Sequence, residues 1–358
     1  MKNTMCWICA LFLINSLSSF AQTRPTLTFD PISGDYVLKY QFNDQVIEKF
    51  FVPATKVDPT LNVRVSSSAE TARYSYTLSN GHAGRQRLLS FRIKVPDNLV
   101  LQVLSPNSQW RSRPAGVISG WYWGHTLVDS TGAATAYNGI PPDSVVEGFS
   151  LLSMGLPTLT LAYFQGFTGA MNFESEPPAE VHEILKPLES FPANYVSRKT
   201  IGPSYAPSPN PFIHLAFLDT IISYTRQSAE LGWLGRDRDN DCDSDERPED
   251  GIVRNIEKRL NKAKRELERR DSVLARRELE KLVAKVERLW KRSEDNEEGK
   301  HGKDRKNWWR RDKDDRVVIT SEAYALLKFN TEYLIDRLLD ESSRRPDRKP
   351  KKGSKDRD

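Results

Sequence analysis

The residues best placed for chemistry form one acidic segment, 237–250 (DRDNDCDSDERPED), in which aspartates occupy alternate positions. Alternate carboxylates in a loop can converge on a hard cation, and calcium loops use this spacing. The better frame offers five ligands: Asp239, Asp241, Asp243, Asp245 and Asp250. However, Ser244 stands where such loops usually have glycine, and Asp250 where they usually have glutamate. The sequence therefore leaves two interpretations open, a Ca²⁺ site and a solvated acidic loop.

Tryptophans in two places could stack on flat ligands. Trp110, Trp121 and Trp123 lie in or near the aromatic run WYWGH, where exposed rings beside polar groups would suit glycan binding. The alternative is a core role, because Trp121 and Trp123 are two residues apart and share one strand face. Trp308 and Trp309, flanked by arginines, could stack on bases or sugars or enter a membrane interface. Alternatively, one of them packs across helices and the rest is a linker.

Recognisable catalytic motifs are absent. Ser150 lacks the glycine that follows the nucleophile in G-x-S-x-G, and His182-Glu183 lacks a second histidine four residues after the first. The five histidines have no metal-binding spacing. We therefore expect a protein that is not an enzyme. A hydrolase whose site is assembled from distant residues, around His82 or His125, is the alternative from the enzyme class.

The elements that must position these residues change along the chain. Over 22–194, short runs alternate apolar with polar residues between turn residues, which predicts an antiparallel β-sandwich of seven or more strands. The runs are 36–42, 61–66, 73–78, 88–95, 99–104, 148–152 and 158–163. Residues 195–211 are rich in proline and serine and predict an extended linker.

Four helical segments are expected over 212–341, each with one apolar stripe. The stripes contain Leu215, Leu218, Ile222, Ala229 and Trp233; Ile252, Ile256, Leu260, Ala263 and Leu267; Ala275, Leu279, Leu282, Val286 and Leu289; and Ala323, Leu327, Leu334 and Leu338. A single stripe must be buried against neighbours, so the sequence predicts a small helical bundle. The fold class is therefore α+β, with the sandwich and the bundle as separate domains. Charged insertions interrupt the bundle at 235–250 and 291–316.

The helical runs also carry a resemblance. FLDTIISYTRQSAELGWL, DGIVRNIEKRLNKAKREL, ARRELEKLVAKVERLW and ITSEAYALLKFNTEYLIDRLL are similar to the FIMAH-type helical domain of secreted bacterial proteins. NYVSRKTIGP and GFSLLSMGLP resemble segments of uncharacterised exported proteins that carry this module. The resemblance implies an extracellular, non-catalytic accessory module and supplies no catalytic residues.

The first 21 residues are typical of a secretory signal peptide. Lys2 precedes an apolar run at 6–14, and Ser19-Phe20-Ala21 offers small residues where a signal peptidase cuts. Removal of this segment takes Cys6 and Cys9 with it and leaves Cys242 as the single cysteine, free or in an intermolecular disulfide. We expect a secreted, periplasmic or cell-envelope bacterial protein whose mature chain has no transmembrane segment.

Charge is concentrated in the last third of the chain. From residue 235 onward there are 36 basic and 31 acidic residues, against 17 of each before it. We expect the tail, 342–358, to be disordered and polybasic, which favours anionic partners. The expected partners are an extracellular glycan, an acidic surface polymer or an envelope protein, with no specific nucleic acid. The predicted function is non-catalytic interaction outside the cell or at its envelope, with glycan binding through exposed tryptophans as the alternative.

Overall fold

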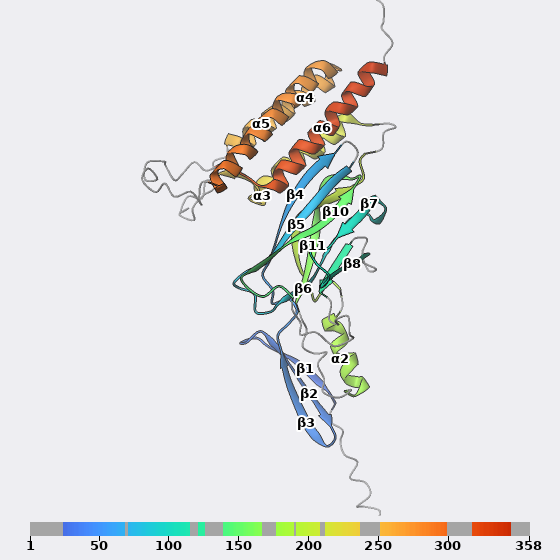
Figure 1. Ribbon diagram of the computed structural model, residues 1–358, viewed down its shortest axis with the longest axis vertical. Helices are drawn as coiled ribbons and strands as arrows, with labels where there is room; N and C mark the ends of the chain where they lie inside the picture. The colour runs from blue at the N-terminus through green and yellow to red at the C-terminus, as the bar shows by residue number, and fades with distance from the viewer. Residues whose placement is uncertain are drawn as a thin grey trace, which may run out of the picture.

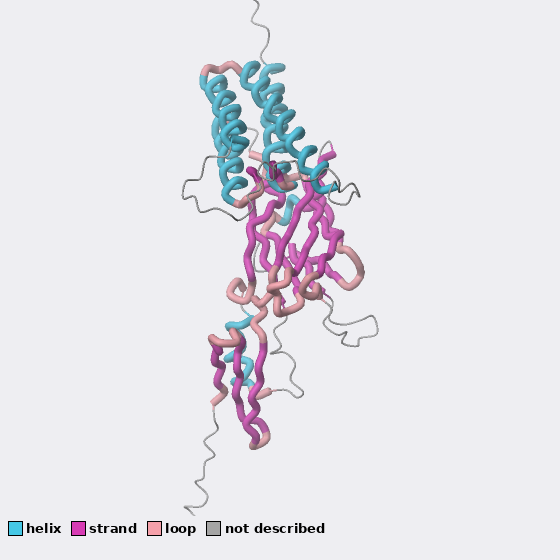
Figure 2. Tube along the Cα trace, turned by 90° about the vertical axis from the view of Figure 1, so that its left-hand side faces the viewer, coloured by secondary structure: helices cyan, strands magenta, loops and turns pink. Residues whose placement is uncertain are grey.

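The computed structural model describes residues 24–68, 71–114, 121–125, 139–166, 177–189, 191–207, 212–236, 251–298 and 317–344. The fold is mixed α+β: antiparallel sheets occupy the N-terminal part and helices the C-terminal part (Figure 1). The tube view shows three levels along the long axis: a small sheet at one end, two larger sheets in the middle and the helices at the other end (Figure 2).

The small sheet contains β1 (Thr26–Asp30), β2 (Asp35–Phe42) and β3 (Gln45–Phe51), in that order. Its one buried face packs on α2 (Ala179–Glu189), a helix from a distant part of the sequence. The shared core contains Leu38, Tyr40, Phe51, Val181 and Leu185. These strands therefore have a core of their own, although we expected all strands of 22–194 in one sandwich. Strand alternation marks a buried face without identifying the element that covers it.

Two larger antiparallel sheets follow. The first has the order β4-β5-β10-β7, with β4 (Pro59–Ser68), β5 (Thr71–Asn80), β10 (Ser144–Ser153) and β7 (Val100–Leu104). The second has the order β12-β11-β6-β9-β8, with β12 (Val196–Ser204), β11 (Leu156–Gly166), β6 (Leu88–Ile93), β9 (Trp121–His125) and β8 (Trp110–Pro114). A short 3-10 helix, η1 (Asp97–Leu99), precedes β7. All seven predicted strand runs overlap observed strands.

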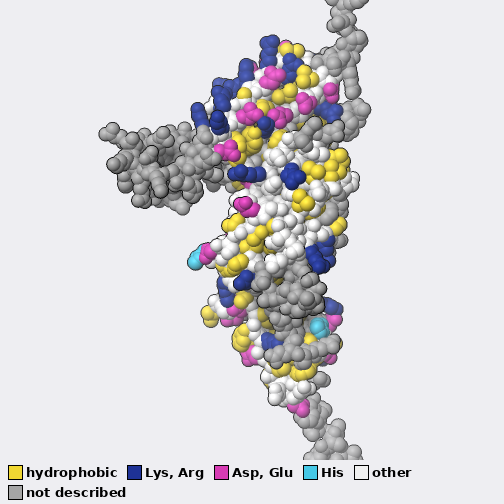
Figure 3. Space-filling view, viewed as in Figure 1, with side chains coloured by type: hydrophobic (Ala, Val, Ile, Leu, Met, Phe, Trp, Pro, Cys, Tyr) yellow, Lys and Arg dark blue, Asp and Glu magenta, His cyan; other side chains and the backbone are white. Residues whose placement is uncertain are grey.

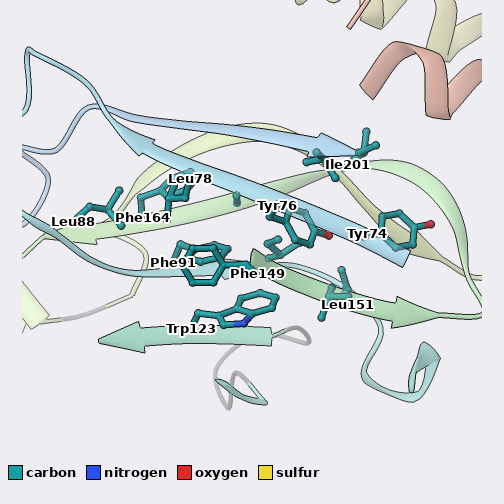
Figure 4. Packing of buried hydrophobic residues seen from close by; sticks show 14 of the residues in the cluster. Tyr74, Tyr76, Leu78, Leu88, Phe91, Trp123, Phe149, Leu151, Phe164 and Ile201 are labelled. Atoms are coloured by element: carbon teal, nitrogen blue, oxygen red, sulfur yellow. The ribbon is translucent and has the colours of Figure 1, made fainter. Parts of the chain in front are cut away.

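One hydrophobic core lies between the two larger sheets (Figure 4). Trp123 of β9 stacks on Phe91 of β6, with ring centroids 4.8 Å apart. Phe149 of β10, from the other sheet, meets Phe91 edge-on at 4.9 Å. Burying each such side chain stabilises the fold by about 1.5–3 kcal/mol. These aromatic side chains therefore hold the two sheets together by packing between them.

The predicted linker, 195–211, is wrong over most of its length, because residues Val196–Ser204 form β12. This strand pairs with β11 from Leu156↔Ser204 to Phe164↔Val196. Pro203 is tolerated because β12 is an edge strand, where a missing N–H need not face a neighbouring strand. Proline and serine therefore indicated an extended chain correctly, but not that it joins a sheet.

The helices are α3 (His214–Glu230), α4 (Gly251–Glu268), α5 (Ser272–Glu298) and α6 (Ser321–Arg344). Most residues of the four predicted stripes lie in one shared helical core, whereas Leu215 and Ala229 stay partly exposed outside it. Two short strands, β13 (Leu234–Arg236) and β14 (Val317–Ile319), pair antiparallel beside the helices. The first residues of the predicted insertions, 235–236 and 291–298, belong to β13 and α5, because α5 continues to Glu298. Residues 342–344 of the predicted tail belong to α6, which extends to Arg344.

Helix α6 belongs to both large cores. Ala325 and Leu326 are buried in the core of the sheets, whereas the next residue, Leu327, is buried in the helical core. The Glu322 carboxylate accepts a hydrogen bond from the Val63 backbone N–H of edge strand β4, at 2.7 Å. Sheets and helices are therefore packed against each other, and the Pro/Ser-rich separation that we expected between two domains is not formed.

Two further polar contacts fix this junction. The Asn330 side-chain amide donates to the Pro157 carbonyl of β11 at 2.9 Å. The hydroxyls of Thr158 on β11 and Tyr224 on α3 are 2.7 Å apart. Hydrogen bonds in a buried interface fix its geometry, because a mismatch would leave polar groups without partners. None of the described helices is both long and apolar enough to cross a membrane.

Candidate functional site

The tryptophans of the predicted glycan site are core residues wherever their side chains are described. Trp110 is 5% exposed and packs edge-on against Phe149 at 5.0 Å. Trp123 is fully buried, and its indole N–H donates to the Leu104 carbonyl at 3.2 Å. Neither ring offers a face to a sugar, which agrees with the core interpretation. Trp121 belongs to β9, but its side chain, and the whole of Trp308 and Trp309, lie outside the described residues.

The structure does not test the predicted Ca²⁺ site of the acidic segment. Asp239, Asp241, Asp243, Asp245 and Asp250 all lie outside the described residues. Within the described ranges, no three His, Cys, Asp or Glu side chains are arranged to hold a metal ion. The Ca²⁺ site therefore stays a prediction from aspartate spacing.

One histidine–carboxylate pair bears on the enzyme alternative. His82 Nδ1 lies 3.0 Å from Asp143 Oδ2, and this contact raises the pKa of His82, chiefly through the hydrogen bond. The two side chains are 94% and 63% exposed, so water surrounds the pair. A general base needs a reacting group within hydrogen-bond reach, and a cavity that excludes water strengthens its effect. His82 and Asp143 could therefore supply the histidine and the carboxylate of a catalytic triad, but they lie on the exposed surface and not in an enclosed cavity.

The most distinctive surface is the outward side of the α4–α5 hairpin. Between residues 251 and 292 the chain has fifteen basic and seven acidic residues. Because the apolar stripes of α4 and α5 face the core, the charged residues on the opposite side of each helix face the solvent. We define the cationic face as the exposed basic residues of this side: Arg254, Lys258, Lys262, Arg265 and Arg269 on α4, and Arg277, Lys281, Arg288, Lys291 and Arg292 on α5. Figure 3 shows a row of Lys and Arg side chains over this part of the molecule.

Acidic residues near the hairpin are largely engaged at its flanks. Glu257 accepts a hydrogen bond from Arg226 of α3 at 2.7 Å, while Asp219 of α3 accepts one from Lys264 at 2.6 Å. These ion pairs join α3 to α4. Lys258 and Arg265, by contrast, have no ion pair with any described residue. The positive charges on the outward side are therefore only partly compensated.

A single buried carboxylate, Glu278, lies between the two rows of basic side chains. Lys262 of α4 and Lys281 of α5 both approach its Oε1 at 2.9 Å, and Arg259 lies 3.5 Å from its Oε2. The hydrogen bond from Lys262, followed by that from Lys281, lowers the pKa of Glu278. One carboxylate thus joins the two helices and cannot neutralise three cations.

The excess of positive charge also affects a neighbouring lysine. Partial burial lowers the pKa of Lys285, and repulsion from Arg259 and Arg288 lowers it further. Such repulsion marks a site where a bound anion would be stabilised, because the anion would relieve it. The cationic face therefore presents a partly compensated row of positive charges along α4 and α5.

The sequence analysis did not predict this surface, because it considered only the apolar stripes of these helices. Glu266 pairs with Arg269 at 3.6 Å. The available signal was the helical spacing of basic residues on the side opposite each apolar stripe. Comparisons with protein-family models, with characterised proteins and with solved structures gave no match, so the resemblance to the FIMAH-type domain stays a prediction.

Proposed function

We propose that this chain is an exported bacterial binding protein without catalytic activity, and that its cationic face contacts an acidic surface polymer of the cell envelope. In this proposal the two larger sheets form a β-sandwich, and α3–α6 form a FIMAH-type helical bundle. The apolar run and small residues at the N-terminus support export. The observation that carries the binding proposal is the set of ten exposed basic side chains on one side of α4 and α5.

The geometry of the cationic face suits an extended partner. Side chains four residues apart on a helix are separated by about 6 Å along its axis, and the row from Arg254 to Arg269 extends about 22 Å. A linear polymer with repeated negative charges can meet several of these side chains at once. Each contact releases counterions from the polymer, so affinity depends steeply on salt.

Retention of the full chain on immobilised heparin, a sulfated polysaccharide, over a range of salt concentrations tests the proposal. The double variant Lys258→Glu/Arg265→Glu reverses two charges of the cationic face. We expect it to elute at lower salt, with the salt-dependence slope reduced by about one for each lost contact. Both side chains are exposed and outside the core, so the fold should be retained.

Two controls separate the cationic face from other positive charge. Arg198→Glu/Lys199→Glu makes the same change in net charge on exposed residues of β12, and should elute like the parent. A chain ending at Arg344 removes the basic tail and should keep most of the retention. Equal loss for the two double variants would contradict the proposal, because net charge would then explain binding. Complete loss on tail removal would assign binding to the tail instead.

A further inference from the structure

A second surface with binding chemistry lies where sheets and helices meet. It is a cleft of about 550 Å³, a volume in the range of small-molecule sites. It is lined by the outward side of β4 and β5, by Glu147 and Gly148 of β10, by Trp290 and Glu294 of α5, and by residues 319–322 around the start of α6. The cleft exists because α6 is fixed against the sheet.

The floor of the cleft is the outward side of β4 and β5, where strand alternation places polar residues. Asn62, Arg64 and Ser75 are exposed, while their neighbours Val63, Tyr74 and Tyr76 are buried. A β-bulge in β10, between Val146 and Phe149, interrupts this alternation. Bulges redirect side chains and are frequent beside binding sites.

This bulge adds a carboxylate to the rim of the cleft. Glu147 is exposed within the bulge, and Gly148 follows it with φ +97°. Such a backbone conformation is strained for residues with a side chain, so glycine allows the bulge to form. The extra residue of the bulge and the conformational freedom of Gly148 together place Glu147 at the cleft.

The walls are held in place by contacts that do not depend on a ligand. Trp290 of α5 stacks on Tyr324 of α6, with ring centroids 5.1 Å apart and planes at 23°. Glu322 is bonded to the Val63 N–H, so the start of α6 is fixed on the edge of the sheet. The cleft is therefore largely preformed, and ordering it would cost a ligand little of its binding free energy.

Several polar groups of the cleft have unused bonding capacity. Arg64, Glu147 and Glu294 form no ion pair with any described residue, although each lines the cleft. Asn62, Ser75 and Ser293 add neutral donors and acceptors, and Trp290 adds an aromatic surface. A ligand that suits this set must offer both donors and acceptors on a compact frame that also has an apolar side.

We propose that this cleft binds a saccharide that is uncharged or carries amino groups. Sugar hydroxyls both donate and accept hydrogen bonds, which suits the mixture of carboxylate, guanidinium, amide and hydroxyl groups. The C–H side of a sugar ring packs well on an indole such as Trp290. Among the described lining residues, Glu147 and Glu294 form no ion pair and Arg64 is the one guanidinium, so this balance of charge disfavours an acidic sugar. The cleft and the cationic face therefore take ligands of different charge.

Calorimetric titration of the full chain with four tetrasaccharides tests this proposal: cellotetraose, chitotetraose, maltotetraose and tetraglucosamine. The double variant Arg64→Ala/Ser75→Val removes two polar groups from exposed strand positions. We expect at least one tetrasaccharide to bind, and the variant to weaken its binding by about tenfold or more, as for loss of a charged hydrogen bond. Valine suits an exposed strand position, so folding should be unaffected.

Arg73→Ala is the matched control, because Arg73 is an exposed arginine of the same sheet that does not line the cleft. It should bind the tetrasaccharide like the parent, as should the Lys258→Glu/Arg265→Glu variant of the cationic face. No binding of any tetrasaccharide at millimolar concentration would overturn the proposal. Equal weakening by Arg73→Ala, or loss of binding with the cationic-face variant, would overturn it too, and would leave the heparin result unaffected.

Discussion

Two neighbouring leucines of α6 test whether sheets and helices unfold together. Leu326 is fully buried in the core of the sheets, and Leu327 is fully buried in the helical core. If α6 unites the two parts, truncation of either leucine must destabilise both. If the parts were independent domains, Leu326→Ala would act chiefly on the sheets and Leu327→Ala on the helices.

The expected magnitude follows from burial. Replacing a fully buried leucine by alanine removes three carbons, which at about 0.8 kcal/mol each costs about 2.4 kcal/mol of transfer free energy. The remaining cavity raises the loss in unfolding free energy to about 3–4 kcal/mol. For a cooperative unit of this size, that loss lowers Tm by roughly 6–12 °C. Leu101→Ala is the control, because Leu101 is 52% exposed and its truncation should change stability by less than about 0.5 kcal/mol.

The assay is thermal or urea unfolding of the full chain, followed by two probes. Far-UV circular dichroism reports chiefly on the helices, and near-UV circular dichroism on packed aromatic residues such as Trp123 and Phe91. We expect the two transitions to coincide in the parent and to shift together in both variants. Two separate transitions, with each variant shifting a different one, would refute the reasoning.

Two more predictions concern charge. The hydrogen bonds from Lys262 and Lys281 hold the pKa of Glu278 below its ordinary value of 4.5, so its ionised form stabilises the fold above that pH and this contribution is lost as pH falls through the lowered value. Glu278→Gln should therefore lower Tm at neutral pH, with a difference that shrinks in acid; a constant difference in a pH series of melting curves would contradict this. If the acidic segment binds calcium, millimolar calcium should raise the Tm of the full chain but not that of Asp241→Asn/Asp243→Asn. An unchanged parent melting curve would exclude a stabilising site.

Some of the candidate sites could be judged from sequence and others could not. The pair Trp121 and Trp123 shares one strand face, and the burial of Trp123 follows from the ordinary preference of strands for one buried face. The cleft between the sheet and the helices was not predictable, because its floor, bulge and walls come from β4, β10, α5 and α6. The periodic pattern of a single strand or helix cannot predict a site whose residues come from several elements.

The helical stripes and seven of the strands were determined by the sequence alone, because local periodicity fixes which side of an element avoids water. The same periodicity places basic residues opposite the apolar stripes of α4 and α5, although the sequence analysis predicted no binding surface there. Tertiary structure decided which element covers each apolar side. It made 196–204 a strand, placed α2 on a distant sheet and shared α6 between two cores. An apolar pattern in the sequence shows that one side of a helix or strand must be buried against another element. Only the packing of the whole chain decides which element that is.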